Sequence, residues 1–186
     1  MSHIKLTTAE MGRMSVEDYQ RADKLPLVAV LDNVRSQHNV GAVFRTADAM
    51  RLERVALCGI CCCPPNPEIH KTALGAEDSV AWMYYKDTID AVRALKEQGY
   101  RVYAIEQAHN SVTLEAFADS LTAESDHNRL AVVFGHEVFG VQQEVIDICD
   151  GCIEIPQYGT KHSLNVSVTA GIVLYRLSIA LRALNG

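Results

Sequence analysis

Apolar and polar residues follow one another along the chain in two kinds of segment, short apolar runs and longer stretches with helical spacing. The short runs predict six strands, over residues 27–31, 55–58, 80–85, 100–105, 130–134 and 152–155. Strands that alternate with helices usually pair in parallel and carry helices on the faces of the sheet. The pattern therefore predicts an α/β fold with a mostly parallel sheet flanked by helices.

Helical spacing and capping residues predict the elements between the strands. Ser15 followed by Asp18 is typical of a capping box that opens a short helix ending near Arg21. A buried apolar face predicts a helix over 39–51, and a further helix is expected over 141–149. Another helix begins at the cap residue Asp87, runs to residue 98 and stops at Gly99.

The last predicted helix, about 164–185, is apolar on two faces. One face carries Leu164, Val168, Ile172, Tyr175 and Ile179, and the other carries Val166, Val173, Leu177, Ala180 and Leu184. Polar residues interrupt the apolar stretch, which argues against a membrane span. A helix with two apolar faces must be covered on both. We expect the sheet of the same chain to cover one face and a second copy to cover the other, which predicts a homodimer through the C-terminal helix.

Length and charge limit the organisation and the partners. A chain of 186 residues fits one domain, and we expect a short N-terminal extension over 1–26 followed by a single domain over 27–186. Residues 1–10 lack the apolar core of a signal peptide, so a cytoplasmic protein is expected. The net charge of −6 does not by itself indicate a nucleic-acid binder. A phosphate-binding patch would have to be local, near the less acidic N-terminal third.

The six cysteines allow two interpretations. Two CxxC spacings, Cys58 with Cys61 and Cys149 with Cys152, are typical of the four thiolates of a zinc site and would make the chain a zinc-stabilised interaction module. However, Cys58 closes one apolar run and Cys152 opens another, as buried core cysteines do. We favour core cysteines and predict neither a metal nor disulfide bonds.

Three segments rich in glycine and polar residues follow predicted strands, over 33–48, 134–140 and 155–167. Because ligands of open α/β sheets bind at the carboxyl ends of strands, we expect these segments to converge into one pocket. The Gly135 to Gly140 spacing is that of a P-loop, but Val141 and Gln142 replace its Lys and Ser/Thr. A nucleotide-binding P-loop is therefore excluded.

The same three segments resemble, in order, motifs one, two and three of the SpoU (TrmH-like) branch of the SPOUT-superfamily RNA methyltransferases. The third is the most specific, with a strand ending in Ile-Pro, then Gly159, then Ser-Leu-Asn-Val-Ser over 163–167 entering a helix. The resemblance covers about 27–182. It implies a C-terminal deep trefoil knot, S-adenosyl-L-methionine bound within the knot, and homodimers whose active sites mix residues of both subunits. It also implies methyl transfer to a ribose 2′-hydroxyl of RNA. With no separate RNA-binding domain in the chain, tRNA is the first expected substrate and rRNA the second.

The resemblance also assigns residues. Those matching cofactor positions are Ile105, Glu106, Gly135, Ile155, Ser163 and Leu164, and those matching catalytic positions are Asn39, Arg45, Glu137, Ser163 and Asn165. A sugar hydroxyl is a poor nucleophile until it loses its proton. Because arginine is normally protonated, we expect Arg45 to grip the phosphate beside the target ribose and to stabilise the developing alkoxide. Whether it also acts as the base is left open.

Cations are needed to hold the RNA phosphates. The candidates are Arg13, Arg21, Arg35, Arg45 and Lys71, the last in a segment, 71–75, expected to be a loop near the site. His38, His136 and His162 lie in or beside the motifs, but the family has no invariant histidine there, so none is given a catalytic role. A homologue that only binds the cofactor or RNA is an alternative, against which the intact catalytic residues argue.

Overall fold

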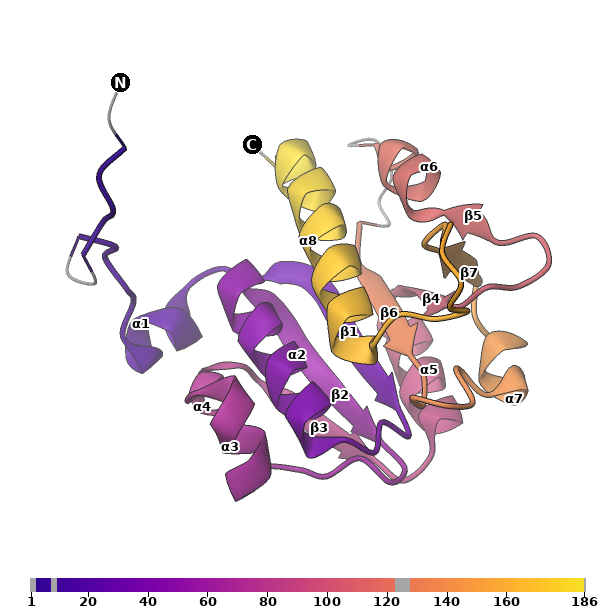
Figure 1. The fold of residues 1–186 in the computed structure, drawn as a ribbon, viewed down its shortest axis with the longest axis horizontal. Coiled ribbons are helices and arrows are strands. Elements are labelled where there is room, and N and C mark those ends of the chain that lie inside the picture. The colour runs from indigo at the N-terminus through magenta and orange to yellow at the C-terminus, as the bar shows by residue number, and fades with distance from the viewer. Residues whose placement is uncertain (1–2, 8–9, 123–127, 186) are drawn as a thin grey trace.

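The computed structural model of the protein describes residues 3–7, 10–122 and 128–185 (Figure 1). Within them, seven strands form one sheet in the order β3-β2-β1-β6-β4-β7-β5, and all neighbouring strands pair in parallel. The strands are β1 Leu25–Asp32, β2 Leu52–Cys58, β3 Trp82–Tyr85, β4 Arg101–Ile105, β5 Val112–Thr113, β6 Leu130–Phe134 and β7 Gly151–Glu154. The expected α/β fold with a parallel sheet is confirmed. The two-residue β5 was not predicted, because so short a strand leaves no apolar run.

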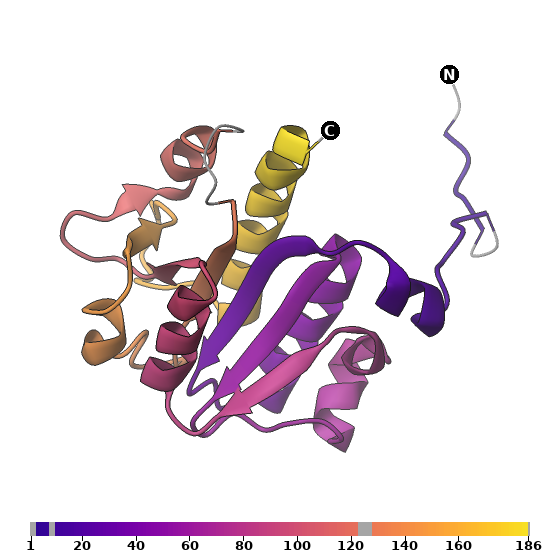
Figure 2. The same cartoon turned by 180° about the vertical axis from the view of Figure 1, so that it is seen from behind.

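Helices cover both faces of this sheet. They are α1 Val16–Arg21, α2 Gln37–Met50, α3 Pro67–Ala73, α4 Ala76–Ser79, α5 Thr88–Glu97, α6 Leu114–Asp119, α7 Gln143–Ile146 and α8 Val166–Asn185. In Figure 1, α2 and α8 lie in front of the sheet, and in Figure 2 α5 lies on the opposite face. Strand β1 shows why both faces must be covered. Its Leu27, Ala29 and Leu31 belong to one core cluster and its Val28 and Val30 to the other, and all five are fully buried.

Two of the predicted helix starts are confirmed by their caps. The Asp18 N–H donates to Ser15 Oγ at 3.0 Å at the start of α1, and Asp87 accepts from the Ile89 N–H at 2.8 Å at the start of α5. Gly99, with φ of 83°, follows the end of α5 as expected. Side-chain caps are local signals, so the sequence shows them directly.

Two other helix predictions and one loop prediction need correction. Helix α2 begins at Gln37, two residues before the predicted start, because Ser36 is its N-cap. The helix predicted over 141–149 is only α7, because carboxylates from distant strand ends, Glu106 and Asp32, accept the N–H groups of Val141 and Gln142. Much of the loop expected over 71–75 lies in α3, which Asn66 caps.

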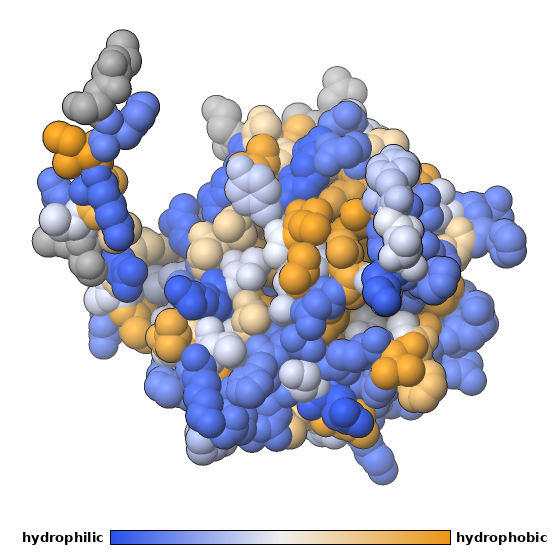
Figure 3. Space-filling model, in the orientation of Figure 1, coloured by the Kyte–Doolittle hydropathy of each residue, from blue (hydrophilic) through white to orange (hydrophobic). Residues whose placement is uncertain are grey.

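Helix α8 is apolar on two sides, and the chain covers one of them. Its buried apolar residues are Val166, Ala170, Val173, Leu174, Leu177 and Leu181, packed in the cluster that also contains α2 and β1 residues. Its opposite side carries Val168, Ile172, Tyr175 and Ile179, which are 40–57% exposed. Figure 3 shows apolar side chains on the front of the molecule, where Figure 1 places α8. By length and composition α8 passes the test for a membrane span, but here it is a core helix with one uncovered face.

Candidate functional site

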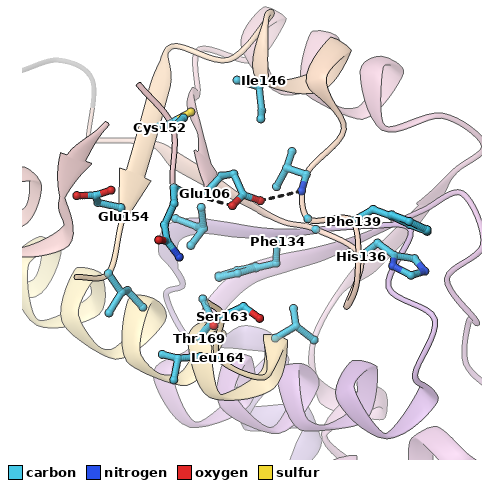
Figure 4. Close-up of a pocket in the computed structure, with 18 of the residues that line it drawn as sticks. Glu106, Phe134, His136, Phe139, Ile146, Cys152, Glu154, Ser163, Leu164 and Thr169 are labelled. Carbon is cyan, nitrogen blue, oxygen red and sulfur yellow. Dashed lines mark hydrogen bonds between the residues drawn. The ribbon is translucent and has the colours of Figure 1, made fainter. Parts of the chain in front are cut away.

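A pocket of about 1010 Å³ opens at the carboxyl ends of β4, β6 and β7 (Figure 4). Three chain segments line it, one after each of these strands. The six residues predicted to bind a cofactor all line it, namely Ile105, Glu106, Gly135, Ile155, Ser163 and Leu164. The structure therefore brings the second and third polar segments together, as expected for ligand sites of open α/β sheets.

Two glycines allow the backbone to fold tightly at this pocket. His136 and Gly140 exchange backbone hydrogen bonds of 3.0 and 2.9 Å, which closes a turn over 136–140. A Cβ added to Gly135 would lie 2.0 Å from the carbonyl carbon of Gly140 and 2.1 Å from the nitrogen of Val141. One added to Gly140 would lie 2.2 Å from Glu106 Oε2. Neither position accepts a side chain unless the backbone or the Glu106 carboxylate moves.

The Glu106 carboxylate holds the loops of the pocket in place. It accepts from the backbone N–H of Gln107 at 2.9 Å and from that of Val141 at 3.1 Å (Figure 4). The side-chain amide of Gln107 in turn donates to the carbonyl of His162 at 2.8 Å. Glu106 thus lines the pocket as predicted, but its oxygens are engaged in linking the segments after β4 and β6.

Glu137 joins the first polar segment to the second. Its carboxylate accepts from the backbone N–H of Ser36 at 2.8 Å, from that of Arg35 at 3.0 Å and from the Asn39 side-chain amide at 3.0 Å. Partial burial opposes ionisation of this carboxyl, but the donors outweigh it and hold the pKa of Glu137 below its usual value. The group is therefore an ionised anchor for the start of α2.

Asn39 also contacts the third segment. The Asn165 side-chain amide donates to Asn39 Oδ1 at 3.3 Å, and Asn165 Oδ1 accepts from the Ser167 N–H at 2.9 Å. A continuous polar network therefore links Glu137, Asn39 and Asn165. Ser36, and not Asn39, is the N-cap of α2, so the Asn39 side chain is available for this network.

Arg45 lies outside the pocket of its own chain. It stands six residues after Asn39, about 9 Å along the axis of α2. It lines a second hollow, of about 640 Å³, together with Lys71 and Thr72 of α3 and Gly171 and Tyr175 of α8. Within the described part of the chain its guanidinium forms no hydrogen bond or ion pair. A single chain therefore brings together Asn39, Glu137 and Asn165 but leaves Arg45 apart.

The other predicted RNA contacts come from three separate segments of the chain. Arg13 is exposed before α1 and Arg21 is exposed within it, and the exposed Arg35 donates its backbone N–H to the Glu137 carboxylate. Lys71 lines the same hollow as Arg45 and forms an ion pair of 2.6 Å with Glu68 one turn earlier, so part of its charge is already compensated.

One residue that shapes the site was not predicted from the sequence. Asp32, at the end of β1, is fully buried and accepts from Thr88 Oγ1 at 2.6 Å, from Asn33 Nδ2 at 2.9 Å and from the Gln142 N–H at 3.0 Å. It therefore ties the loop before α7 to the starts of α5 and of the first polar segment. The available signal was an acidic residue that closes an otherwise apolar strand.

The cysteines do not form the alternative zinc site. Strands β2 and β7, which carry Cys58 and Cys152, are separated by β1, β6 and β4, a span of about 19 Å at the usual spacing of strands. Among the residues described, no three His, Cys, Asp or Glu side chains are grouped to hold a metal ion, and the six thiols are free. Burial raises the pKa of Cys61 and of Cys149 to about 12, as in unreactive core thiols.

Comparison with known sequences gives one family. Residues 26–175 match the SpoU rRNA Methylase family. The tRNA (guanosine(18)-2′-O)-methyltransferase of Thermus thermophilus is 33% identical over 171 residues, which are 89% of this chain and 81% of that protein. The 23S rRNA (guanosine-2′-O-)-methyltransferase RlmB of Vibrio parahaemolyticus is 31% identical over 166 residues, which are 89% of this chain but only 64% of that protein.

Solved structures agree. A TrmH/SpoU tRNA modifying enzyme of A. aeolicus superposes with a TM-score of 0.75 and 26% identity, over 90% of this chain and 81% of that one. An AdoMet-bound rRNA methyltransferase of Sinorhizobium meliloti superposes with a TM-score of 0.73 and 26% identity, over 88% of this chain and 62% of that one. The family match and the similarity to these enzymes show that the chain belongs to the SpoU (TrmH-like) family of SPOUT RNA methyltransferases.

Proposed function

We propose that this protein transfers a methyl group from S-adenosyl-L-methionine to a ribose 2′-hydroxyl of RNA in the cytoplasm. The observation that carries the proposal is the network of Glu137, Asn39 and Asn165, which joins all three motifs beside the pocket. We propose tRNA as the substrate and rRNA as the second candidate. The tRNA methyltransferase of T. thermophilus is matched over a larger share of its length than the Vibrio rRNA enzyme.

The residues of the pocket fit S-adenosyl-L-methionine. The volume of about 1010 Å³ is at the upper end of typical small-molecule sites. Ile105, Ile155 and Leu164 offer apolar contacts for the adenine, and the absence of a side chain at Gly135 lets the backbone approach the ligand. The bound cofactor supplies an electrophilic methyl group on its sulfonium. The protein's part is to hold it, exclude water and orient the sugar.

We place the deep trefoil knot in the segments that follow β4, β6 and β7. Two contacts support this placement: the Gln107 side-chain amide donates to the carbonyl of His162, 55 residues away, and the Val141 N–H donates to the Glu106 carboxylate, 35 residues away. Both contacts join stretches that are far apart along the chain, as a knotted segment requires.

A second copy of the chain is proposed to cover the exposed side of α8. That side carries Val168, Ile172, Tyr175 and Ile179, which belong to one of the two apolar faces predicted for this helix. We expect the protein to be a dimer by analytical ultracentrifugation and Ile172→Asp to be mainly monomeric, because a buried charge at an apolar interface is costly. Met83→Asp, a similarly exposed apolar residue on β3, is the control and should remain dimeric. A monomeric wild-type protein would contradict the proposal.

Dimer formation also gives Arg45 a role. Its hollow includes Tyr175, which belongs to the exposed side of α8, so a partner seated on α8 would lie next to Arg45. We propose that Arg45 reaches the pocket of the partner subunit, where it grips the phosphate beside the target ribose and stabilises the developing alkoxide. Asn39 and Asn165, fixed by Glu137, position the ribose, and Ser163 contacts the cofactor. Arg13, Arg21, Arg35 and Lys71 are proposed to hold further phosphates.

Methyl transfer from labelled S-adenosyl-L-methionine tests the function. We expect incorporation into total tRNA by the wild-type protein and a loss of about 10²–10³-fold in Arg45→Ala, the usual effect of removing one group that stabilises an oxyanion. Cofactor binding by Arg45→Ala should be unchanged, because Arg45 is proposed to contact the RNA phosphate and not the cofactor, and the residues that line the pocket are untouched. Absence of incorporation into both tRNA and rRNA by the wild-type protein would contradict the proposal.

A further inference from the structure

An exposed aromatic side chain stands at the mouth of the pocket. Phe139 lies at the tip of the 136–140 turn and is 82% exposed, although it lines the pocket together with His136 (Figure 4). Isolated exposed apolar residues are common on protein surfaces. This one differs from them in its position beside the reaction site and in the rigidity of the turn that carries it.

The turn is held from several sides. Two backbone hydrogen bonds between His136 and Gly140 close it, and the Val138 N–H donates to His136 Nδ1 at 3.0 Å. Glu137, inside the turn, is fixed by the three donors at the start of α2. A ligand that contacts Phe139 therefore meets a surface that is already ordered, so that little conformational entropy is lost on binding.

The two rings of the turn form a small stack. The centroids of the His136 and Phe139 rings are 4.9 Å apart and their planes are inclined by 33°. This distance is within the range of stacked aromatic pairs. With His136 beside it and an exposed fraction of 82%, Phe139 still has an open ring surface. Unpaired RNA bases are commonly held by stacking on such side chains.

The turn also holds a basic residue by its backbone. The backbone N–H of Arg35 donates to the carboxylate of Glu137, two residues from Phe139, and the Arg35 side chain is exposed. The turn thus offers an aromatic face for a base, and the segment bound to it carries a cation that can pair with a phosphate. The uncovered side of α8 has a different character, since its apolar residues extend along the helix, and this difference favours RNA over a protein partner at Phe139.

We infer that Phe139, supported by His136, is the stacking platform for the base of the nucleotide that is methylated. The inference rests on the proposed function and extends it to substrate positioning. A base on Phe139 places its own ribose at the mouth of the pocket, because the sugar is attached directly to the base. Stacking accepts any base, so the platform positions the nucleotide without selecting its identity.

Kinetics of single variants test the inference first. Phe139→Leu keeps an apolar side chain but removes the ring, and we expect the KM for RNA to rise about tenfold, within the range for loss of one stacked base. Phe139→Tyr should behave as the wild type, and the affinity for S-adenosyl-L-methionine should stay within about twofold in both. Tyr84→Leu removes an exposed ring on β3 and is the matched control, with no expected change.

A spectroscopic measurement tests it without turnover. The chain has one tryptophan, Trp82, on β3, so Trp82→Phe combined with Phe139→Trp gives a single reporter in the turn. A base stacked on the introduced tryptophan should quench its fluorescence when RNA is added, and S-adenosyl-L-methionine alone should not. An unchanged KM in Phe139→Leu, an absence of quenching, or a shift of Phe139→Leu to monomers would each overturn the inference while methyl transfer by the wild type continued. If the wild type itself transferred no methyl group, the proposed function would fail, and quenching by RNA would alone decide whether the platform binds a base.

Discussion

The two hollows of this molecule differ in how completely one chain builds them. In the pocket at the ends of β4, β6 and β7, Glu106 and Gln107 are engaged in hydrogen bonds, and Gly135 lies in backbone contact with Gly140. In the hollow between α2, α3 and α8, Arg45 is exposed and Tyr175 is 57% exposed. The first surface is already organised, whereas the second still presents apolar and cationic groups to water.

This difference indicates that the pocket and the hollow serve different steps, cofactor binding and methyl transfer. A pocket formed by backbone and satisfied polar groups can bind a small cofactor in any assembly state, since ordering it costs nothing further. A hollow with an unengaged guanidinium next to an uncovered apolar helix face acquires its final form only when a partner arrives. Changes in the pocket should therefore abolish cofactor binding, and changes in the hollow should abolish transfer while cofactor binding survives.

The largest effect is expected for Gly135→Ala, which changes the backbone packing of the pocket at the ends of β4, β6 and β7. The added Cβ would lie about 2 Å from backbone atoms of Gly140 and Val141, so the 136–141 loop must move. We expect a loss of about 100-fold or more in affinity for S-adenosyl-L-methionine by calorimetry, and a loss of stability of about 1–3 kcal/mol, as for other overpacked sites.

Gly159→Ala is the matched control, because a Cβ there has no neighbour within 4 Å. It belongs to the segment after β7, and its affinity for the cofactor should change by less than about twofold if crowding is the cause. Equal losses in the two variants would mean that glycine flexibility, and not the close approach of the backbone, shapes the pocket.

Mixing two inactive variants tests whether Arg45, from the hollow of one subunit, acts in the pocket of the other. Arg45→Ala and Glu137→Ala should each be inactive as homodimers, since every site lacks one group. If Arg45 acts in the partner's pocket, half of the randomly reassociated dimers contain one intact site of two, and about a quarter of the wild-type activity returns. If both groups act within one chain, no hybrid has an intact site and no activity returns, which would refute a shared site.

The fold was largely predictable because local patterns decide it. The six longer strands follow from apolar runs, and the parallel order follows from the helices between them. The predicted helix limits are wrong where contacts with residues distant in the sequence determine the local structure. The helix predicted over 141–149 is shortened because two distant carboxylates accept the backbone N–H groups at its start. Asp32 accepts from the amide 110 residues later, and Glu106 accepts from the amide 35 residues later. Local spacing contains no trace of such contacts.

The candidate site was predictable to the same degree. The motifs gave six residues predicted to bind the cofactor, and all six line the pocket. The position of Arg45 was not, because helical spacing shows which face of α2 carries it but not that α3 and α8 flank it. Asp32 was missed because a carboxylate at the end of a strand looks like the start of an ordinary loop, and its burial arises only in three dimensions.

The smallest expected effect is the loss of stability when Glu137, which joins the start of α2 to the pocket, loses its charge. Because the pKa of folded Glu137 is lowered, the stability it contributes is present above the ordinary pKa near 4.5 and is lost as the pH falls through the lower, folded value. At pH 7 Glu137→Gln should lower the free energy of unfolding by about 1 kcal/mol, since one charged acceptor of backbone N–H groups is replaced by a neutral one. In urea titrations this difference in unfolding free energy should narrow as the pH falls below the ordinary carboxyl pKa, while Glu144→Gln, a change of an exposed carboxylate on α7, should show no such difference at neutral or acidic pH. A difference that stays constant on acidification would mean that Glu137 acts through its shape and not its charge. The alignment of α2 with the pocket, and hence the reach of Arg45 toward a partner, would then not depend on an ionised anchor.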